Sequence, residues 1–192
     1  MRVVLLCHAV TDGVRLARFG GDDAPTENGL VDARALAVPR ADLVCCAPSR
    51  ACRETAAHLG SDTSGLDTDG LDAKVDEGLN GCDYGRWRGK TLDEVLAAEP
   101  EALSGWLADP GAAPHGGESL TALGERVGRW LDDRHGIAHT VLAIADAAVI
   151  RAAVVYAIEA GPRSVWRIDV SPLTRTVLVG EPGRWSLREF CR

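Results

Sequence analysis

The chain has 192 residues, of which 46% are hydrophobic and 26% charged, which is the composition of an ordinary globular protein. This length fits a single domain over residues 1–192, and no apolar run approaches the ~20 residues that cross a bilayer. The net charge is −7 and the arginines are scattered, so neither nucleic acid nor an anionic membrane is an expected partner. The N-terminus lacks the form of a signal peptide, and we expect a cytoplasmic protein.

The first predicted element is a strand that covers Arg2 to Cys7 and consists almost entirely of apolar, mostly branched residues. Such a run indicates a parallel strand buried on both faces. It ends in His8, and the carboxyl ends of parallel strands face the crevice where open α/β sheets bind ligands. His8 is therefore a candidate site residue, the alternative being a core histidine bonded to a backbone carbonyl.

Further predicted elements follow in a regular order along the chain. We expect a loop over 13–28, a helix over 28–37, a strand over 42–47, a helix over 50–59 capped by Ser49, and a connector over 60–70. A short strand at 74–75 and a glycine-rich loop over 79–89 come next, then a helix launched by a capping box at 91–94, and helices over 101–109 and 119–133. A strand from Thr140, a helix over 147–160 and short strands at 165–170, 174–179 and 185–187 complete the chain.

This alternation of strands and helices predicts a three-layer α/β/α sandwich with a mostly parallel sheet. The strand from Thr140 ends in Asp146 and leads directly into a helix, as the first strand ends in His8. Asp146 is therefore a second candidate site residue, with a helix N-cap as its structural alternative.

The motifs of these elements resemble the histidine phosphatase superfamily, the phosphoglycerate-mutase-like proteins. The resemblance spans nearly the whole chain and depends on four segments: Ala47-Pro48 through Thr55-Ala56, Asp83-Tyr84-Gly85-Arg-Trp-Arg-Gly89, His115-Gly-Gly-Glu-Ser119 and Val149-Ile150-Arg151. The tripeptide Arg134-His135-Gly136 also spells a family motif, but it follows a helix instead of a strand, so we regard it as accidental.

The resemblance implies five catalytic groups, and the sequence keeps one of them. His8 stands where the family has the histidine that attacks phosphorus. The positions of two phosphate-binding arginines, the acid and the second histidine hold, in that order, Cys7, Ala51, Gly81 and Asp146. Phosphoryl transfer depends on positioning and on neutralising negative charge. We therefore expect efficient phosphatase or mutase activity to be lost.

Three functions remain open. The first is an acid–base enzyme acting on a small, non-phosphorylated metabolite through His8, Asp146 and Cys7. The second is a catalytically inactive pseudophosphatase that serves as a binding module. The third is a weak phosphomonoester hydrolase that uses His8, with Arg50 and Asp83 as substitutes for the missing groups. The first is preferred because ionisable residues stand at two of the changed positions.

We expect substrate contacts from Arg50, Asp83, Ser49, His115 and Glu118. Arg50 is adjacent to the position of the missing arginine at Ala51, and one helical position is a rotation of about 100°. No cofactor is expected. A metal site at His8, Asp146 and Cys7 has no supporting ligand spacing. The sequence does not define the substrate or the oligomeric state.

Overall fold

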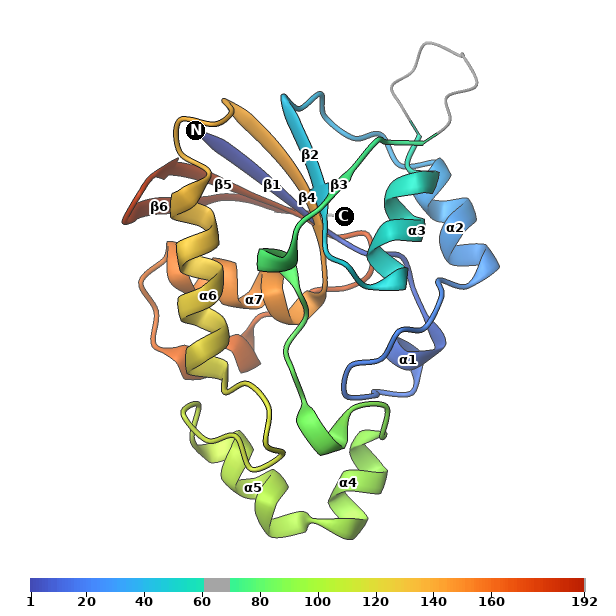
Figure 1. Cartoon of the computed structure of the whole chain (residues 1–192), viewed down its shortest axis with the longest axis vertical. Coiled ribbons are helices and arrows are strands. Elements are labelled where there is room, and N and C mark those ends of the chain that lie inside the picture. The colour runs from blue at the N-terminus through green and yellow to red at the C-terminus, as the bar shows by residue number, and fades with distance from the viewer. Residues whose placement is uncertain (61–69, 192) are drawn as a thin grey trace.

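Six strands of the described part of the chain form one mixed sheet in the order β3-β2-β4-β1-β5-β6 (Figure 1). The computed structural model describes residues 1–60 and 70–191. The strands are β1 (Arg2–Cys7), β2 (Leu43–Cys46), β3 (Lys74–Val75), β4 (Thr140–Ala145), β5 (Arg175–Glu181) and β6 (Arg184–Cys191). β3, β2, β4 and β1 run parallel, whereas β5 and β6 are antiparallel to their neighbours. The predicted sandwich with a mostly parallel sheet is confirmed.

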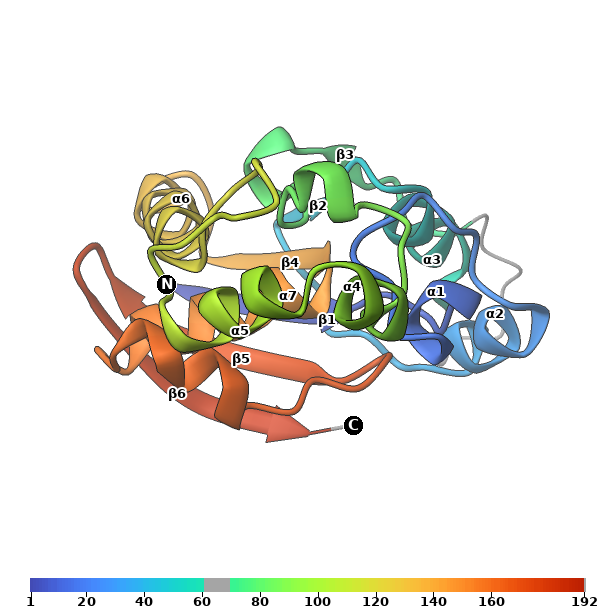
Figure 2. The same cartoon turned by 90° about the horizontal axis from the view of Figure 1, so that it is seen from below.

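Helices cover both faces of this sheet, with α2 and α3 on one side and α6 and α7 on the other (Figure 2). The α-helices are α1 (Asp12–Arg15), α2 (Glu27–Arg34), α3 (Arg50–His58), α4 (Leu92–Ala98), α5 (Pro100–Ala108), α6 (Leu120–Asp133) and α7 (Ala147–Ala157). Short 3-10 helices cover η1 (Glu77–Leu79), η2 (Gly85–Trp87) and η3 (Pro162–Arg167). α4 and α5 extend away from the sheet at the end where the parallel strands terminate (Figure 1).

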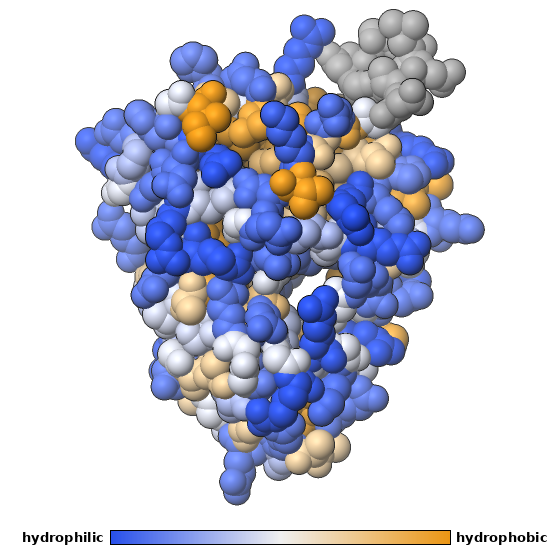
Figure 3. All heavy atoms as spheres, viewed as in Figure 1, coloured by the Kyte–Doolittle hydropathy of each residue, from blue (hydrophilic) through white to orange (hydrophobic). Residues whose placement is uncertain are grey.

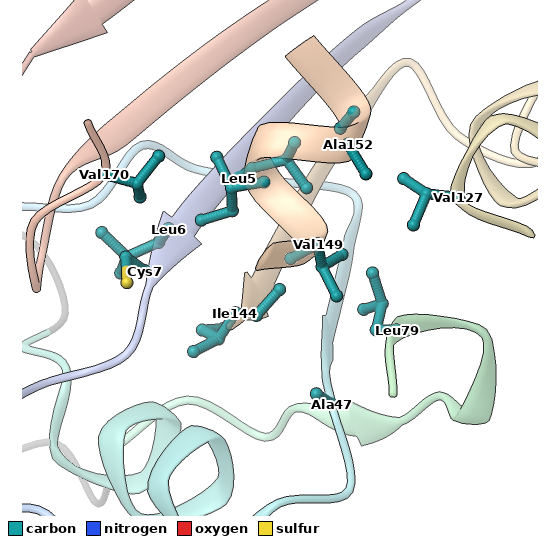
Figure 4. Packing of buried hydrophobic residues seen from close by; sticks show 14 of the residues in the cluster. Leu5, Leu6, Cys7, Ala47, Leu79, Val127, Ile144, Val149, Ala152 and Val170 are labelled. Carbon is teal, nitrogen blue, oxygen red and sulfur yellow. The ribbon is translucent and has the colours of Figure 1, made fainter. Parts of the chain in front are cut away.

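The core is built on the two central strands, β1 and β4. From Val3 to Leu6 and from Val141 to Ala145 every side chain is buried, as expected for strands covered on both faces. Figure 4 shows Leu5 and Leu6 of β1 close to Ile144 and Val149. Each fully buried Leu or Ile side chain contributes about 1.5–3 kcal/mol. Because both faces of β1 and β4 are packed in the core, the carboxyl ends of these two strands are held in fixed positions.

An aromatic cluster attaches the α4–α5 segment to the rest of the protein. Trp106 of α5 lies edge-on to Trp166 of η3, with ring centroids 4.8 Å apart, and it also contacts Phe19 and Trp87. Aromatic pairs of this kind contribute about 0.5–1.5 kcal/mol beyond the area they bury. The cluster therefore holds α5 in a defined place over the ends of the strands.

Several predicted elements differ from the structure. The segment 165–170, expected as a strand, is not one: residues 165–167 belong to η3 and 168–170 are irregular, because Pro162 begins a helical turn and Trp166 packs on Trp106. The expected loop over 79–89 contains η2. The expected loop over 13–28 contains α1, which Thr11 caps by accepting a hydrogen bond from the Val14 N–H. Most of the expected connector over 60–70 lies outside the described residues. None of the described helices is both long and apolar enough to cross a membrane.

Candidate active site

A cavity of about 690 Å³ opens at the carboxyl ends of the parallel strands. Cys7 of β1 is in register with Ala145 of β4, so the residues that follow them, His8 and Asp146, emerge side by side. Both line the cavity, and Nε2 of His8 lies 3.3 Å from Oδ1 of Asp146. In Figure 3 the surface is hollowed between the sheet-bearing part of the molecule and the α4–α5 segment.

The His8 ring is held in one tautomer by the backbone. Its Nδ1 lies 2.8 Å from the carbonyl oxygen of Ala9, and because a carbonyl only accepts, Nδ1 must carry a proton. The Ala9 N–H in turn donates to the Thr55 hydroxyl, and that hydroxyl donates to the Ala51 carbonyl. Nε2 is therefore the atom of the ring that gains or loses a proton.

Asp146 raises the pKa of His8 above its ordinary value. Burial of the ring opposes protonation, but the hydrogen bond to Asp146 and the charge of its carboxylate outweigh that effect, and the Ala9 carbonyl adds to it. With a proton on both nitrogens, His8 becomes an imidazolium that donates to Ala9 and to Asp146. The lone pair of Nε2 is then occupied by the proton that faces Asp146.

Asp146 occupies the N-cap position of α7, but its side chain makes no capping hydrogen bond. The carboxylate turns toward His8 instead, and its side chain is 29% exposed. The opposite side of the carboxylate faces Gly81, where an added Cβ would lie only 2.9 Å from Oδ2. The side chain of Asp146 therefore does not cap α7, which was the structural alternative to a role in the site.

The loop that carries Gly81 is fixed by one arginine of α6. Arg126 donates to the carbonyl oxygens of Gly78 and Gly81, at 3.0 and 3.3 Å. The same guanidinium forms a two-bond pair with Glu118, at 2.9 and 2.8 Å. Such a fork-to-fork pair has strict geometry, so Arg126 and Glu118 set the position of Gly81 beside Asp146.

Of the expected substrate contacts, Ser49 and Asp83 line the cavity. The hydroxyl of Ser49 also caps α3 by accepting from the Cys52 N–H, as predicted. Oδ1 of Asp83 accepts from the Gly85 N–H at 2.9 Å.

Four predicted site residues are not brought to the cavity, and the structure corrects their placement. Cys7 is buried in the core, at 2% exposure, and does not line the cavity; Figure 4 shows it near Val170. Burial, followed by the charge of Asp146, raises the pKa of its thiol to about 12. Arg50 is exposed, and its Nε donates to Glu54 at 2.6 Å.

His115 and Glu118 are the other two predicted site residues that do not line the cavity. The His115 ring is buried against Trp87, with centroids 5.0 Å apart, and its Nδ1 accepts from the Gly117 N–H at 3.1 Å. Burial lowers the pKa of His115, which favours this neutral form. Glu118 is engaged by Arg126. Both residues therefore support the site from outside the cavity.

Sequence reasoning missed several cavity residues. Three arginines, Arg18, Arg88 and Arg151, line it, together with Tyr84. Burial raises the pKa of Tyr84, with Cys82 and Asp146 acting in the same direction, so its hydroxyl stays protonated. Arg151, Tyr84 and Arg88 stand in segments that carried the family resemblance, which was a usable signal, whereas Arg18 stands in an irregular segment that offered none.

The cavity wall carries more negative than positive charge. Its three arginines are accompanied by five carboxylates, which leaves two negative charges in excess while His8 is neutral and one when it is protonated. The carboxylates are Asp22, Asp23, Glu77, Asp83 and Asp146. Within the described residues, no cluster of three or more His, Cys, Asp or Glu side chains forms a metal site.

Comparison with known proteins gives consistent matches. The model of the histidine phosphatase superfamily (branch 1) matches residues 3–192. A glucosyl-3-phosphoglycerate phosphatase of Mycolicibacterium vanbaalenii is 32% identical over 131 residues, which cover 65% of this chain and 56% of that protein. The chain thus matches little more than half the length of this relative, and 28% of three further mycobacterial relatives.

Two other matches cover more of both chains. A putative phosphoserine phosphatase 2 of Hydrogenobacter thermophilus is 27% identical over 192 residues, covering 94% of this chain and 91% of that one. The solved structure of a mycobacterial glucosyl-3-phosphoglycerate phosphatase with VO3 superimposes with a TM-score of 0.80 at 25% identity, covering 97% of this chain and 96% of that chain.

Proposed function

Because this chain belongs to the histidine phosphatase superfamily, we propose that it is a diverged member in which His8 and Asp146 transfer protons on a small, non-phosphorylated metabolite. The observation that carries the proposal is the 3.3 Å contact between Nε2 of His8 and the Asp146 carboxylate. An imidazole with a fixed tautomer and a carboxylate partner is a common acid–base arrangement.

The same contact disfavours attack on phosphorus. A nucleophilic imidazole needs a free lone pair on Nε2, and Asp146 favours a proton on that atom. The carboxylate would also repel the oxygens of a phosphoryl group. At an effective dielectric constant of about 20, two unit charges about 4 Å apart interact by about 4 kcal/mol, so one misplaced charge has a large effect on the rate.

Proton transfer requires a proton donor and a proton acceptor close to the substrate, and side chains that can serve as both line the cavity. The pair can donate a proton from Nε2 of His8 or accept one on the Asp146 carboxylate, which is partly exposed to the cavity. Tyr84 keeps its hydroxyl proton and lines the same cavity, so it can donate a hydrogen bond to a substrate oxygen. A volume of about 690 Å³ accommodates a small metabolite.

A proton-exchange assay tests the proposal for any substrate that carries an exchangeable C–H proton. Pools of small carbonyl and hydroxy acids are incubated with the protein in D2O, and loss of proton signals is followed by NMR. We expect exchange or conversion of at least one compound, abolished in His8→Ala and in Asp146→Asn. If no pool changes, while a metabolite still binds in the cavity, the pseudophosphatase binding module becomes the better description.

Weak phosphomonoester hydrolysis is the second candidate, favoured by the phosphatase names of the relatives and by three arginines at the cavity. Arg50, the substitute expected from sequence, is not one of these arginines. Turnover of p-nitrophenyl phosphate that disappears in His8→Ala, even well below the rates of about 1 s⁻¹ or more that are ordinary for enzymes, would establish this candidate in place of the first.

A further inference from the structure

Two chain segments that are distant in sequence form one part of the cavity rim. The Phe19 N–H donates to the Lys90 carbonyl at 2.9 Å, and the Gly89 N–H donates back to the Phe19 carbonyl at 2.8 Å. The Leu92 N–H extends this antiparallel contact by donating to Ala17 at 3.0 Å. The pairing joins the segments that carry Arg18 and Arg88, and both arginines line the cavity.

Both arginines keep donors that no side chain of the described residues takes up. Arg18 donates from one nitrogen to the Gly89 carbonyl at 2.9 Å and forms no ion pair within the described chain. Arg88 makes no side-chain hydrogen bond or ion pair there; its stem lies over Gly20, where an added Cβ would be 3.8 Å from Cγ. Gly20 adopts φ +59°, which lets the loop turn beneath that stem.

Three of the carboxylates that line the cavity with these arginines are directed elsewhere. Asp22 accepts from the Arg50 backbone N–H at 2.7 Å, and Asp83 accepts from Gly85. The Asp23 carboxylate lies against Gly13 of α1 and Gly21 of its own loop, where added Cβ atoms would be 2.5 and 2.8 Å from Oδ2. The free guanidinium donors at the mouth are therefore open to a ligand.

We propose that Arg18 and Arg88 form an oxyanion-binding subsite that holds a carboxylate tail of the substrate at the mouth of the cavity. A planar guanidinium fork matches the two oxygens of a carboxylate and binds them through paired hydrogen bonds. The assignment of this ligand as a substrate rests on the proposed function. It adds a substrate class: a small molecule with an anionic tail at the arginines and a proton-exchanging centre at His8 and Asp146.

The test follows the Nε–Hε signals of Arg18 and Arg88 by NMR while the protein is titrated with glutarate, inorganic phosphate or neutral glutaramide. We expect saturable shifts of both signals with glutarate or phosphate and none with glutaramide. Tighter binding of phosphate than of glutarate would contradict a carboxylate tail. Arg88→Gln should weaken binding at least about tenfold, whereas Arg163→Gln, which changes an exposed arginine outside the cavity, should not alter it.

Asp146→Asn separates this proposal from the proposed function. Binding of the anion should persist in that variant, because the subsite does not involve Asp146, even if all proton exchange is lost. Equal affinity in wild type, Arg88→Gln and Arg163→Gln would overturn the subsite. So would anion binding that depends on Asp146 but leaves the two arginine signals unshifted.

Discussion

Gly81 and Asp146 are complementary in shape: the missing side chain of one leaves the space that the carboxylate of the other requires. A Cβ on Gly81 would lie 2.9 Å from Oδ2 of Asp146 and 3.4 Å from its Cγ. The family resemblance places an acid at the position of Gly81 and a histidine at that of Asp146. The two departures therefore belong together, since an acidic side chain at 81 would displace the Asp146 carboxylate from its present place.

Gly81→Ala should disturb the His8–Asp146 pair. The added methyl group forces the Asp146 carboxylate to move, because Oδ2 is the flexible end of a side chain and the backbone of Gly81 is held by Arg126. We expect the pKa of His8 to fall toward its ordinary value, measured by NMR titration. The cost to folding should be only about 1 kcal/mol. Gly124→Ala is the control, since nothing lies within 4 Å of its added Cβ. An unchanged His8 pKa in Gly81→Ala would contradict the complementarity.

Asp146→Asn should lower both the pKa of His8 and the stability in acid. Because the folded-state pKa of His8 is raised, its stabilising effect is complete below the unfolded value near 6.5 and fades as the pH rises through the folded value. We expect a loss of about 1–3 kcal/mol at about pH 5.5 and almost none at alkaline pH, measured by urea denaturation. A constant difference at every pH would show that Asp146 stabilises the fold without coupling to His8.

Asp146→His should improve the binding of a phosphate analogue. The substitution removes the repelling carboxylate and frees Nε2 of His8. We expect wild type to bind vanadate weakly, and the variant to gain at least about tenfold in affinity, or about 1.4 kcal/mol, by calorimetry. Asp146→Asn separates the two effects, since it removes the charge without adding an imidazole. Tight vanadate binding by wild type would contradict the expectation.

Arg126→Met should loosen the loop that carries Gly81. The variant leaves Glu118, whose side chain is 17% exposed, without its partner, and two loop carbonyls lose their donor. We expect a loss of about 2–4 kcal/mol in the free energy of unfolding. Arg126→Met combined with Glu118→Gln should recover part of it. In both variants the pKa of His8 should fall, a change that a purely structural pair elsewhere in the protein would not cause.

Cys7→Ala should leave the chemistry of the cavity intact. The thiol is buried, its pKa is raised to about 12, and it does not line the cavity. We expect a modest loss of about 1 kcal/mol from the smaller core side chain and an unchanged His8 titration. In native wild-type protein, iodoacetamide at neutral pH should not label Cys7, as mass spectrometry of peptides can show. Rapid labelling of Cys7 would make it a catalytic candidate again.

The sequence predicted the fold well because its main signals are local. The apolar run from Arg2 to Cys7 and the run from Thr140 are too uniformly hydrophobic for exposed strands, and both are central. Ser49, Thr91 and Ser119 cap the helices that they were expected to begin. The prediction of a strand over 165–170 was wrong because a tertiary contact, the packing of Trp166 on Trp106, determines the conformation of this segment.

The site was predictable only where strand register determines it. His8 and Asp146 meet because β1 and β4 are aligned to their last residues. Cys7 was misplaced even though the alternation of strand side chains, which needs no structure, points it away from His8. Arg18 and Arg88 could not be found in this way, since loop pairing brings them together and no periodic pattern marks it.

Both edges of the sheet are poor templates for another strand. On one side β3 offers only two residues. On the other, β6 is the outermost strand (Figure 2). The pairing of Val177 with Glu189 and of Leu178 with Leu187 leaves Arg188 as an extra residue, a bulge that interrupts the regular hydrogen bonding of β6. Short, bulged and charged edges discourage the edge-to-edge growth that leads to fibres. Neighbouring molecules therefore find little regular strand edge on which to extend this sheet.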